Sequence, residues 1–169
     1  PNRGDIYNNS DSFRYIYNTI QGDFRMTVRL VDTLSEHEWA KSGLMARESA
    51  DANSRNVYLY YPEGTERLTL SYRRNTGNST NRIYQYFPDS PAPPPPIHLR
   101  MEREGNEFTG SYSMDGESWT TLGSETNTPL PIDSEILVGI ASCSHDSGDI
   151  GPAIYEDFEI CRPTGISSA

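Results

Sequence analysis

The chain has 169 residues, which is the length of one globular domain, and its 11% aromatic content argues against a disordered polymer. Its formal net charge of −10 is the opposite of what nucleic acids and anionic membrane surfaces attract, so we expect neither as a partner. No apolar run approaches the roughly 18 residues of a transmembrane helix. The chain starts at Pro1 without a recognisable secretion signal, and we interpret it as a module of a larger or processed protein with neighbouring domains.

Alternation of apolar and polar residues predicts a succession of short strands and no helix. A polar, turn-rich segment at 1–12 precedes the first of them. We expect about ten to twelve strands, separated by turn signals every 8–12 residues or so, which is typical of a β-sandwich or barrel. The clearest expected strands are 13–17, 24–30, 39–49, 56–61, 68–73, 83–87, 97–101, 108–114, 136–142 and 153–160.

The two strands at 39–49 and 56–61 have faces of different composition. Leu44 and Ala46 share one face, and Val57 and Leu59 share one face of the next strand, so we assign these residues to the core. The opposite faces would then form an open sheet surface. Along that surface, and along the later strands, we expect aromatic and basic side chains, namely Trp39, Lys41, Arg47, Tyr58, Tyr60, Arg73, Tyr84 and Tyr86.

A hairpin is predicted at 111–123, where Asp115-Gly116 is a tight-turn dipeptide. Glycine takes a positive φ without a steric penalty, so this dipeptide can reverse the chain. Trp119 and Leu122 follow on the returning strand, and we expect Trp119 to anchor the core.

Glycoside hydrolysis uses a pair of carboxyl groups, so the acidic clusters of the chain bear on whether it is an enzyme. The two acidic clusters, at 102–104 and 156–159, lie on strands whose polar side is expected to face solvent. The chain has no G-x-S-x-G, H-E-x-x-H or phosphate-binding glycine loop. We therefore expect a protein that is not an enzyme.

Calcium is the ion that the hard oxygen ligands of this chain would suit, and an acidic surface without a metal is the alternative. The candidate ligands, which require the N-terminus and the late loop to meet, are Asp5, Asp11, Asp149 and Asp157. No other cofactor is expected. The two cysteines, Cys143 and Cys161, belong to no metal-type pair, and a disulfide and free thiols both remain open.

Carbohydrate binding is the function that the outward aromatic and basic residues favour. Sugar rings present apolar C–H faces rimmed by hydroxyls, and aromatic platforms beside charged side chains match both features. His145 and Asp146, in the loop after 136–142, are further candidates for this ligand site. Any single tyrosine of the set could simply cover the sheet, so only the face as a whole indicates a binding site.

Several stretches together resemble a known family: GDIYNNSDSFRYIY, WAKSGLMARES, SYSMDGESW, LVGIASCSHDSG and YEDFEI. They are similar to the concanavalin A-like lectin/glucanase jelly-roll modules of secreted bacterial glycoside hydrolases and cell-surface proteins. The resemblance extends over residues 4–161 or so and departs from the family pattern at His98 and at the proline run DSPAPPPP. It implies an all-β, antiparallel jelly-roll β-sandwich with one concave sheet, and it is less specific for the ligand than for the fold.

From the residues and the resemblance together we expect one domain over 1–162 and a tail over 163–169. The expected function is non-catalytic binding of a polysaccharide or oligosaccharide, as part of a secreted or cell-surface protein. The alternatives are a structural or adhesive surface module with a protein ligand, and a diverged glycoside hydrolase.

Overall fold

The computed structural model describes residues 4–34, 37–63, 67–86, 92–145 and 153–163, with the backbone alone for 84–86. Strands, turns and bends account for the regular structure of these ranges, which contain no helix and therefore none that could cross a membrane. In chain order the strands are β1 (Asp5–Tyr7), β2 (Ser10–Ser12), β3 (Arg14–Ile20), β4 (Phe24–Thr33), β5 (Lys41–Arg47), β6 (Asn56–Pro62), β7 (Arg67–Arg73), β8 (Asn81–Tyr86), β9 (Ile97–Glu104), β10 (Glu107–Ser113), β11 (Thr120–Glu125), β12 (Ile136–Cys143) and β13 (Ala153–Cys161).

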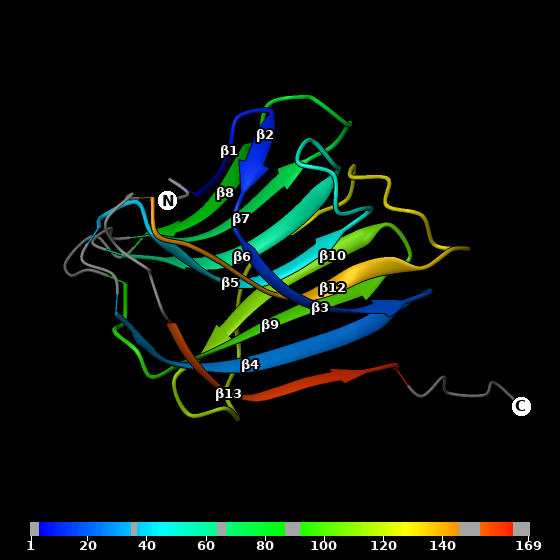
Figure 1. The fold of residues 1–169 in the computed structure, drawn as a ribbon. Helices are drawn as coiled ribbons and strands as arrows, with labels where there is room; N and C mark the ends of the chain where they lie inside the picture. Colours follow the sequence, from blue (N-terminus) through cyan, green and yellow to red (C-terminus); the bar gives the residue numbers. More distant parts are fainter. Residues whose placement is uncertain (1–3, 35–36, 64–66, 87–91, 146–152, 164–169) are drawn as a thin grey trace, which may run out of the picture.

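The strands form two stacked antiparallel sheets and a short hairpin (Figure 1). The six-stranded sheet has the order β3-β12-β5-β6-β7-β8, and the five-stranded sheet has the order β11-β10-β9-β4-β13. Strands β1 and β2 pair with each other and lie in front of the six-stranded sheet. The predicted all-β antiparallel sandwich is therefore confirmed.

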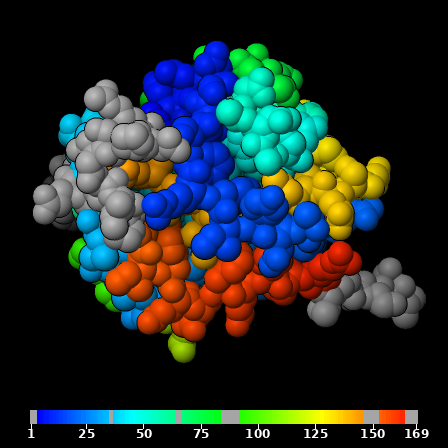
Figure 2. All heavy atoms as spheres, viewed as in Figure 1, coloured from blue at the N-terminus to red at the C-terminus, as the bar shows by residue number. Residues whose placement is uncertain are grey.

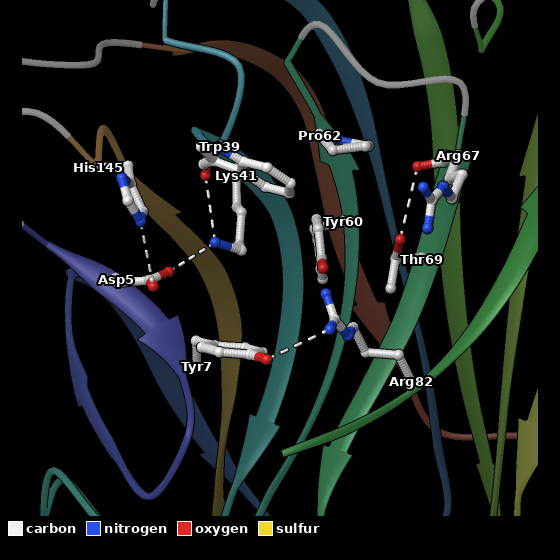
Figure 3. A pocket seen from close by; sticks show the side chains of 10 residues that line it. All are labelled: Asp5, Tyr7, Trp39, Lys41, Tyr60, Pro62, Arg67, Thr69, Arg82 and His145. Atoms are coloured by element: carbon white, nitrogen blue, oxygen red, sulfur yellow. Dashed lines mark hydrogen bonds and ion pairs between the residues drawn. The ribbon is translucent and has the colours of Figure 1, made fainter. Parts of the chain in front are cut away.

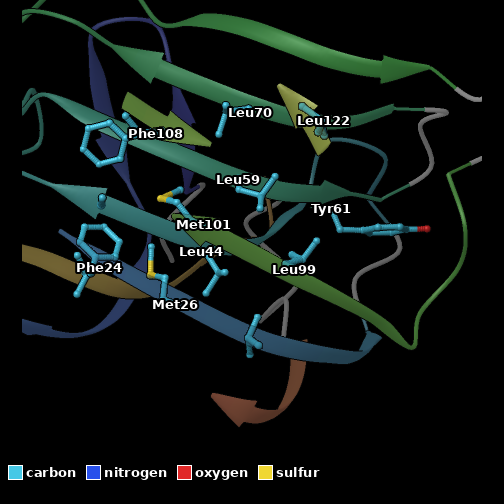
Figure 4. Packing of buried hydrophobic residues seen from close by; sticks show 14 of the residues in the cluster. Phe24, Met26, Leu44, Leu59, Tyr61, Leu70, Leu99, Met101, Phe108 and Leu122 are labelled. Atoms are coloured by element: carbon cyan, nitrogen blue, oxygen red, sulfur yellow. The ribbon is translucent and has the colours of Figure 1, made fainter. Parts of the chain in front are cut away.

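One apolar core fills the space between the two sheets (Figure 4). Leu44 on β5 and Leu59 on β6 point into it and are fully buried, as the alternation predicted. The five-stranded sheet contributes residues of the same period, such as Phe24, whose ring centroid lies 6.3 Å from that of Phe108. Period-two burial along β4 shows why this strand forms: every second side chain enters the core.

The predicted hairpin at 111–123 is present as β10 and β11. The Asp115 carboxylate accepts hydrogen bonds from the backbone N–H groups of Ser118 and Glu117 at 2.7 and 2.8 Å and from the Ser113 hydroxyl at 2.9 Å, which hold the pKa of this carboxyl far below its usual range. Gly116 adopts a φ of 78°, as the turn requires.

The expectation that Trp119 anchors the core was wrong. Its indole is half-buried on the outer side of the sandwich, where it contacts His98 edge-on and the Arg100 guanidinium 4.2 Å from a ring centroid. Leu122, the other residue of the returning strand, is the one that enters the core. Trp119 is the last of the six residues between β10 and β11, so it lies in the turn and not on the returning strand.

A second apolar cluster lies on the outer face of the six-stranded sheet, beneath the N-terminal hairpin. Ile6 of β1 packs there with Met45, Tyr58, Tyr60 and Ala141, all of them buried. In the space-filling view the hairpin, in dark blue, covers this part of the molecule (Figure 2). The outer sheet face is consequently open along part of its area and covered along the rest.

The two cysteines are not bridged. Cys143 is buried at the end of β12, and Cys161 is exposed at the end of β13, which belongs to the other sheet. Of the two alternatives that the sequence left open, the structure shows free thiols.

Candidate functional site

A buried carboxylate on the N-terminal hairpin joins the hairpin to two arginines of the sheet face that it covers. Asp11 of β2 accepts hydrogen bonds from Arg47 Nη1 at 2.6 Å and from Arg73 Nη1 and Nη2 at 2.7 and 2.6 Å. The side chains of Asp11 and Arg73 are fully buried, and that of Arg47 almost fully. Low polarity around the three groups strengthens these charge-assisted bonds and makes an unpaired charge there costly.

Three residues expected on the open ligand face are therefore inaccessible. Arg47 and Arg73 face the predicted side of the sheet, but both are fully buried against Asp11. Tyr58 is also fully buried and donates its hydroxyl to the Ala141 carbonyl at 2.9 Å; burial raises the pKa of this phenol well above its ordinary value. The assignment of these three side chains to a sugar site is corrected, because the N-terminal hairpin covers them.

A groove of about 380 Å³ remains on the same sheet face, beyond the edge of the hairpin (Figure 3). Its volume lies within the ~300–1,000 Å³ range of small-molecule sites. Strands β5, β6, β7 and β8 supply its floor and one side, and β1 and two loops supply the other side. The lining residues are Asp5, Tyr7, Trp39, Lys41, Tyr60, Pro62, Arg67, Thr69, Arg82 and His145.

Aromatic rings form the apolar part of the groove. Trp39, two residues before β5, is 47% exposed and projects over the groove from its loop (Figure 3). Tyr60 lies beneath, stacked on the buried Tyr58 with ring centroids 4.8 Å apart. Tyr60 is only 4% exposed, so it contributes to the floor of the groove and not to an open aromatic face, whereas the Trp39 indole is accessible to a ligand.

One wall of the groove consists of an ion-paired cluster. Asp5 Oδ1 lies 2.6 Å from Lys41 Nζ, and Asp5 Oδ2 lies 3.3 Å from His145 Nε2. The His145 ring is in turn stacked on His37, with centroids 4.8 Å apart. Lys41 also donates to the Trp39 carbonyl at 3.1 Å, so this wall positions the loop that bears the exposed indole.

The opposite wall is basic. Arg67 comes from β7 and Arg82 from the neighbouring strand β8. The Arg82 guanidinium carbon lies 4.9 Å from the centroid of the Tyr7 ring, and its Nη2 lies 3.5 Å from the Tyr7 hydroxyl. Figure 3 shows this guanidinium next to Tyr60, at the end of the groove away from Trp39.

The expected calcium ligands do not come together. Asp11 is neutralised by two arginines, and Asp5 is engaged by Lys41 and His145, so neither carboxylate is disposed to hold a cation. Asp157 is exposed on β13, at an irregularity in its pairing with β4. The described residues contain no group of three acidic, histidine or cysteine side chains arranged to hold a metal ion, and Asp149 lies outside them. The three described candidates, Asp5, Asp11 and Asp157, therefore do not form a calcium site with one another.

The acidic clusters of the five-stranded sheet are occupied by surface ion pairs. Glu102 contacts Arg25 at 2.7 Å and Arg100 at 3.2 Å, and Glu156 contacts Arg29 at 2.6 Å. These carboxylates lie in the sheet that does not form the groove. Their arrangement is that of solvated charge pairs on a sheet exterior.

Of the predicted ligand residues, Trp39, Lys41, Tyr60 and His145 line the groove together. Asp146 and the side chains of Tyr84 and Tyr86 lie outside the described part of the chain.

Sequence reasoning missed Tyr7, Pro62, Arg67, Thr69 and Arg82 as groove residues. Strand periodicity could have found both arginines. Arg67 lies two positions from Thr69 on β7 and so shares its face, and Arg82 shares the face of the two predicted tyrosines of β8. The position of Tyr7 follows from the long-range placement of the hairpin, for which the sequence contains no periodic signal.

No protein-family model matches the chain, and no curated protein matches it. Among solved structures, a functionally unknown protein from Saccharomyces cerevisiae is similar, with a TM-score of 0.69 and 17% identity over 96% of this chain and 85% of the yeast chain. A xylan β-1,4-xylosidase from Bacillus halodurans C-125 has a TM-score of 0.64 and 19% identity, covering 89% of this chain and 30% of the enzyme. Sheep galectin-11, in complex with glycerol, has a TM-score of 0.56 and 7% identity, covering 89% of this chain and 98% of the galectin.

Identities this low show the fold alone. The chain has an antiparallel jelly-roll β-sandwich, the fold that its sequence resemblance implied. It spans less than a third of the length of the xylosidase that it matches.

Proposed function

We propose that the groove on the six-stranded sheet binds carbohydrate and that the chain is a non-catalytic binding module of an exported protein. The observation that supports this most directly is the exposed indole of Trp39 at the groove, with charged groups on both walls. Such a site can contact the C–H face of a pyranose through the rings and its hydroxyls through the charged groups.

The groove chemistry favours binding over hydrolysis. Asp5 is the one carboxylate among the described lining residues, and it is committed to Lys41 and His145. Hydrolysis of a glycosidic bond by either common route uses two carboxyl groups on opposite sides of the bond. The galectin among the similar folds is consistent with a lectin-type role, although its low identity leaves the activity of this chain as a proposal.

The test compares two tryptophans. The purified chain is screened on a glycan array, and the strongest binder is titrated by calorimetry against wild type, Trp39→Ala and Trp119→Ala. We expect Trp39→Ala to weaken binding by about 10-fold or more, since each ring contact contributes ~0.5–1.5 kcal/mol beyond area burial. Trp119→Ala is the matched control, because it removes an indole from the other face of the sandwich.

Two outcomes would overturn the proposal. Failure of the folded chain to bind any arrayed glycan at millimolar concentration would remove the function itself. Loss of binding in Trp119→Ala but not in Trp39→Ala would move the site to the five-stranded sheet.

A further inference from the structure

Two histidines meet at the wall of the groove that carries the Trp39 loop. His37 is half-buried two residues before Trp39, and His145 follows β12; their rings are stacked with centroids 4.8 Å apart. Histidine is the side chain whose ordinary titration falls between pH 5 and 8. A stacked pair of imidazoles beside a binding groove is therefore a place where protons can affect the affinity for a ligand.

The unprotonated form of one ring nitrogen holds the Trp39 loop in its observed shape. The backbone N–H of Trp39 donates to His37 Nδ1 at 3.2 Å, and the backbone N–H of Ala40 donates to the His37 carbonyl at 2.9 Å. A ring nitrogen accepts a hydrogen bond only through its lone pair, so Nδ1 carries no proton in this arrangement. Protonation of Nδ1 turns this acceptor into a donor that faces the Trp39 N–H, and the bond between them is lost.

The other ring of the pair is held in place by the N-terminal strand. His145 Nε2 lies 3.3 Å from Asp5 Oδ2, and the backbone N–H of His145 donates to the Gly4 carbonyl at 3.1 Å. His145 has a φ of 60°, a left-handed conformation that a non-glycine residue keeps only where its surroundings hold it. Because His145 is fixed on this side, positive charge on both rings acts to separate His37 from it.

The other charged and titratable groups at this wall are few in the described part of the chain. Asp5 of β1 and Lys41 of β5 form an ion pair at 2.6 Å, and Lys41 Nζ also donates to the Trp39 carbonyl at 3.1 Å. Burial raises the pKa of the Cys143 thiol, at the end of β12, to about 11, so this thiol stays protonated between pH 5 and 8. Glu38 is exposed beside His37 in the chain, and Arg67 and Arg82 line the opposite side of the groove (Figure 3).

We propose that protonation of His37 weakens ligand binding in the groove, so that the module binds its ligand at neutral pH and releases it at about pH 5.5. A proton from solvent binds to Nδ1, the hydrogen bond from the Trp39 N–H breaks, and the loop carries the indole away from the groove. The proton and the ligand bind to different arrangements of the loop, so each weakens binding of the other. This inference rests on the proposed carbohydrate function and specifies how the same site is regulated.

The test measures affinity at two pH values. The strongest binder from the glycan array is titrated by calorimetry against the wild type and three histidine variants, at about pH 7.5 and about pH 5.5, a range in which carboxyl groups ordinarily stay ionised. For the wild type we expect binding to be ~3- to 10-fold weaker at the lower pH, the factor that corresponds to one hydrogen bond.

The variants assign the response to one ring nitrogen. The amide oxygen of asparagine accepts a backbone N–H two residues on and does not titrate, so His37→Asn should bind like the wild type at neutral pH and change by no more than about 2-fold on acidification. His37→Ala removes the acceptor and should bind weakly at both pH values. His98 lies against Trp119 on the five-stranded sheet, so His98→Gln is the matched control that should keep the wild-type response.

A measurement without ligand follows the loop itself. The chain has two tryptophans, so Trp119→Phe leaves Trp39 as the sole indole, and acrylamide quenching of its fluorescence reports its accessibility. We expect the quenching constant to rise between about pH 7.5 and about pH 5.5, and this rise to disappear when His37→Asn is added.

The outcomes separate this inference from the proposed function. Equal wild-type affinity at both pH values, or a response that persists in His37→Asn, overturns it while Trp39-dependent sugar binding stands. Neutral-pH binding of His37→Asn that is as weak as that of His37→Ala also overturns it, because a non-titrating acceptor would then fail to replace the ring. If no arrayed glycan binds, the proposed function fails, and the quenching data alone decide whether the loop responds to protonation.

Discussion

Replacement of Asp11 by asparagine should destabilise the fold more than any comparable change to a surface charge. The carboxylate receives three charge-assisted hydrogen bonds of 2.6–2.7 Å from two guanidinium groups, and all three side chains are buried. Asparagine preserves the volume but removes the charge, and its amide group cannot accept from both arginines at two oxygens. Arg47 and Arg73 would then be buried cations facing each other across a neutral side chain.

The expected loss follows from this geometry. Removal of one partner from a buried ion pair costs about 3–5 kcal/mol, because the remaining charge is left without compensation. Here one substitution leaves two charges, so we expect the upper part of that range, about 4–5 kcal/mol. For a domain of this size each kcal/mol shifts the melting temperature by roughly 2–4 °C, so a decrease of about 8–20 °C should accompany it.

Urea unfolding followed by tryptophan fluorescence and circular dichroism measures the difference, with Glu156→Gln as the matched control. Glu156 also accepts from an arginine at 2.6 Å, but its side chain is 53% exposed, so its loss should cost no more than about 1 kcal/mol. A cost for Asp11→Asn that is as small as that of the control would refute the reasoning, since it would mean that the buried arginines do not depend on this carboxylate.

Three further results are expected. Trp119→Ala should cost about 1–2 kcal/mol in urea unfolding, because the indole is half-buried against Arg100; a loss of ~3–5 kcal/mol would restore its role as a core anchor. Iodoacetamide should label the exposed Cys161 and not the buried Cys143, because burial raises the pKa of the Cys143 thiol to about 11 and keeps it protonated; equal labelling by mass spectrometry would contradict this. Stability should decline from about pH 9 to about pH 12, because burial raises the pKa of Tyr155 to about 12 and that of Cys143 to about 11, so the folded state keeps protons that the unfolded chain releases; a flat urea midpoint over that window would contradict it.

Local sequence periodicity was sufficient to predict the sandwich and the residues that face its core. Leu44 and Ala46, like Val57 and Leu59, could be assigned to the buried side because a shift of one residue would turn all four towards solvent. The same parity placed Lys41 and Tyr60 on the opposite face, where the structure finds them. The face to which a strand residue points depends on the alternation of its near neighbours, so a sequence pattern of a few residues predicts it.

Whether an outward residue is exposed was decided by the tertiary structure alone. Lys41 and Arg47 lie on one face of one strand, yet the first borders the groove and the second is sealed beneath the N-terminal hairpin. That hairpin is held by contacts such as the one between Asp11 and Arg73, which are 62 residues apart. The local sequence around either residue does not indicate that the other is its partner. Their attraction becomes strong only when the folded chain brings both charges together in a region of low polarity, where it offsets the cost of removing them from water.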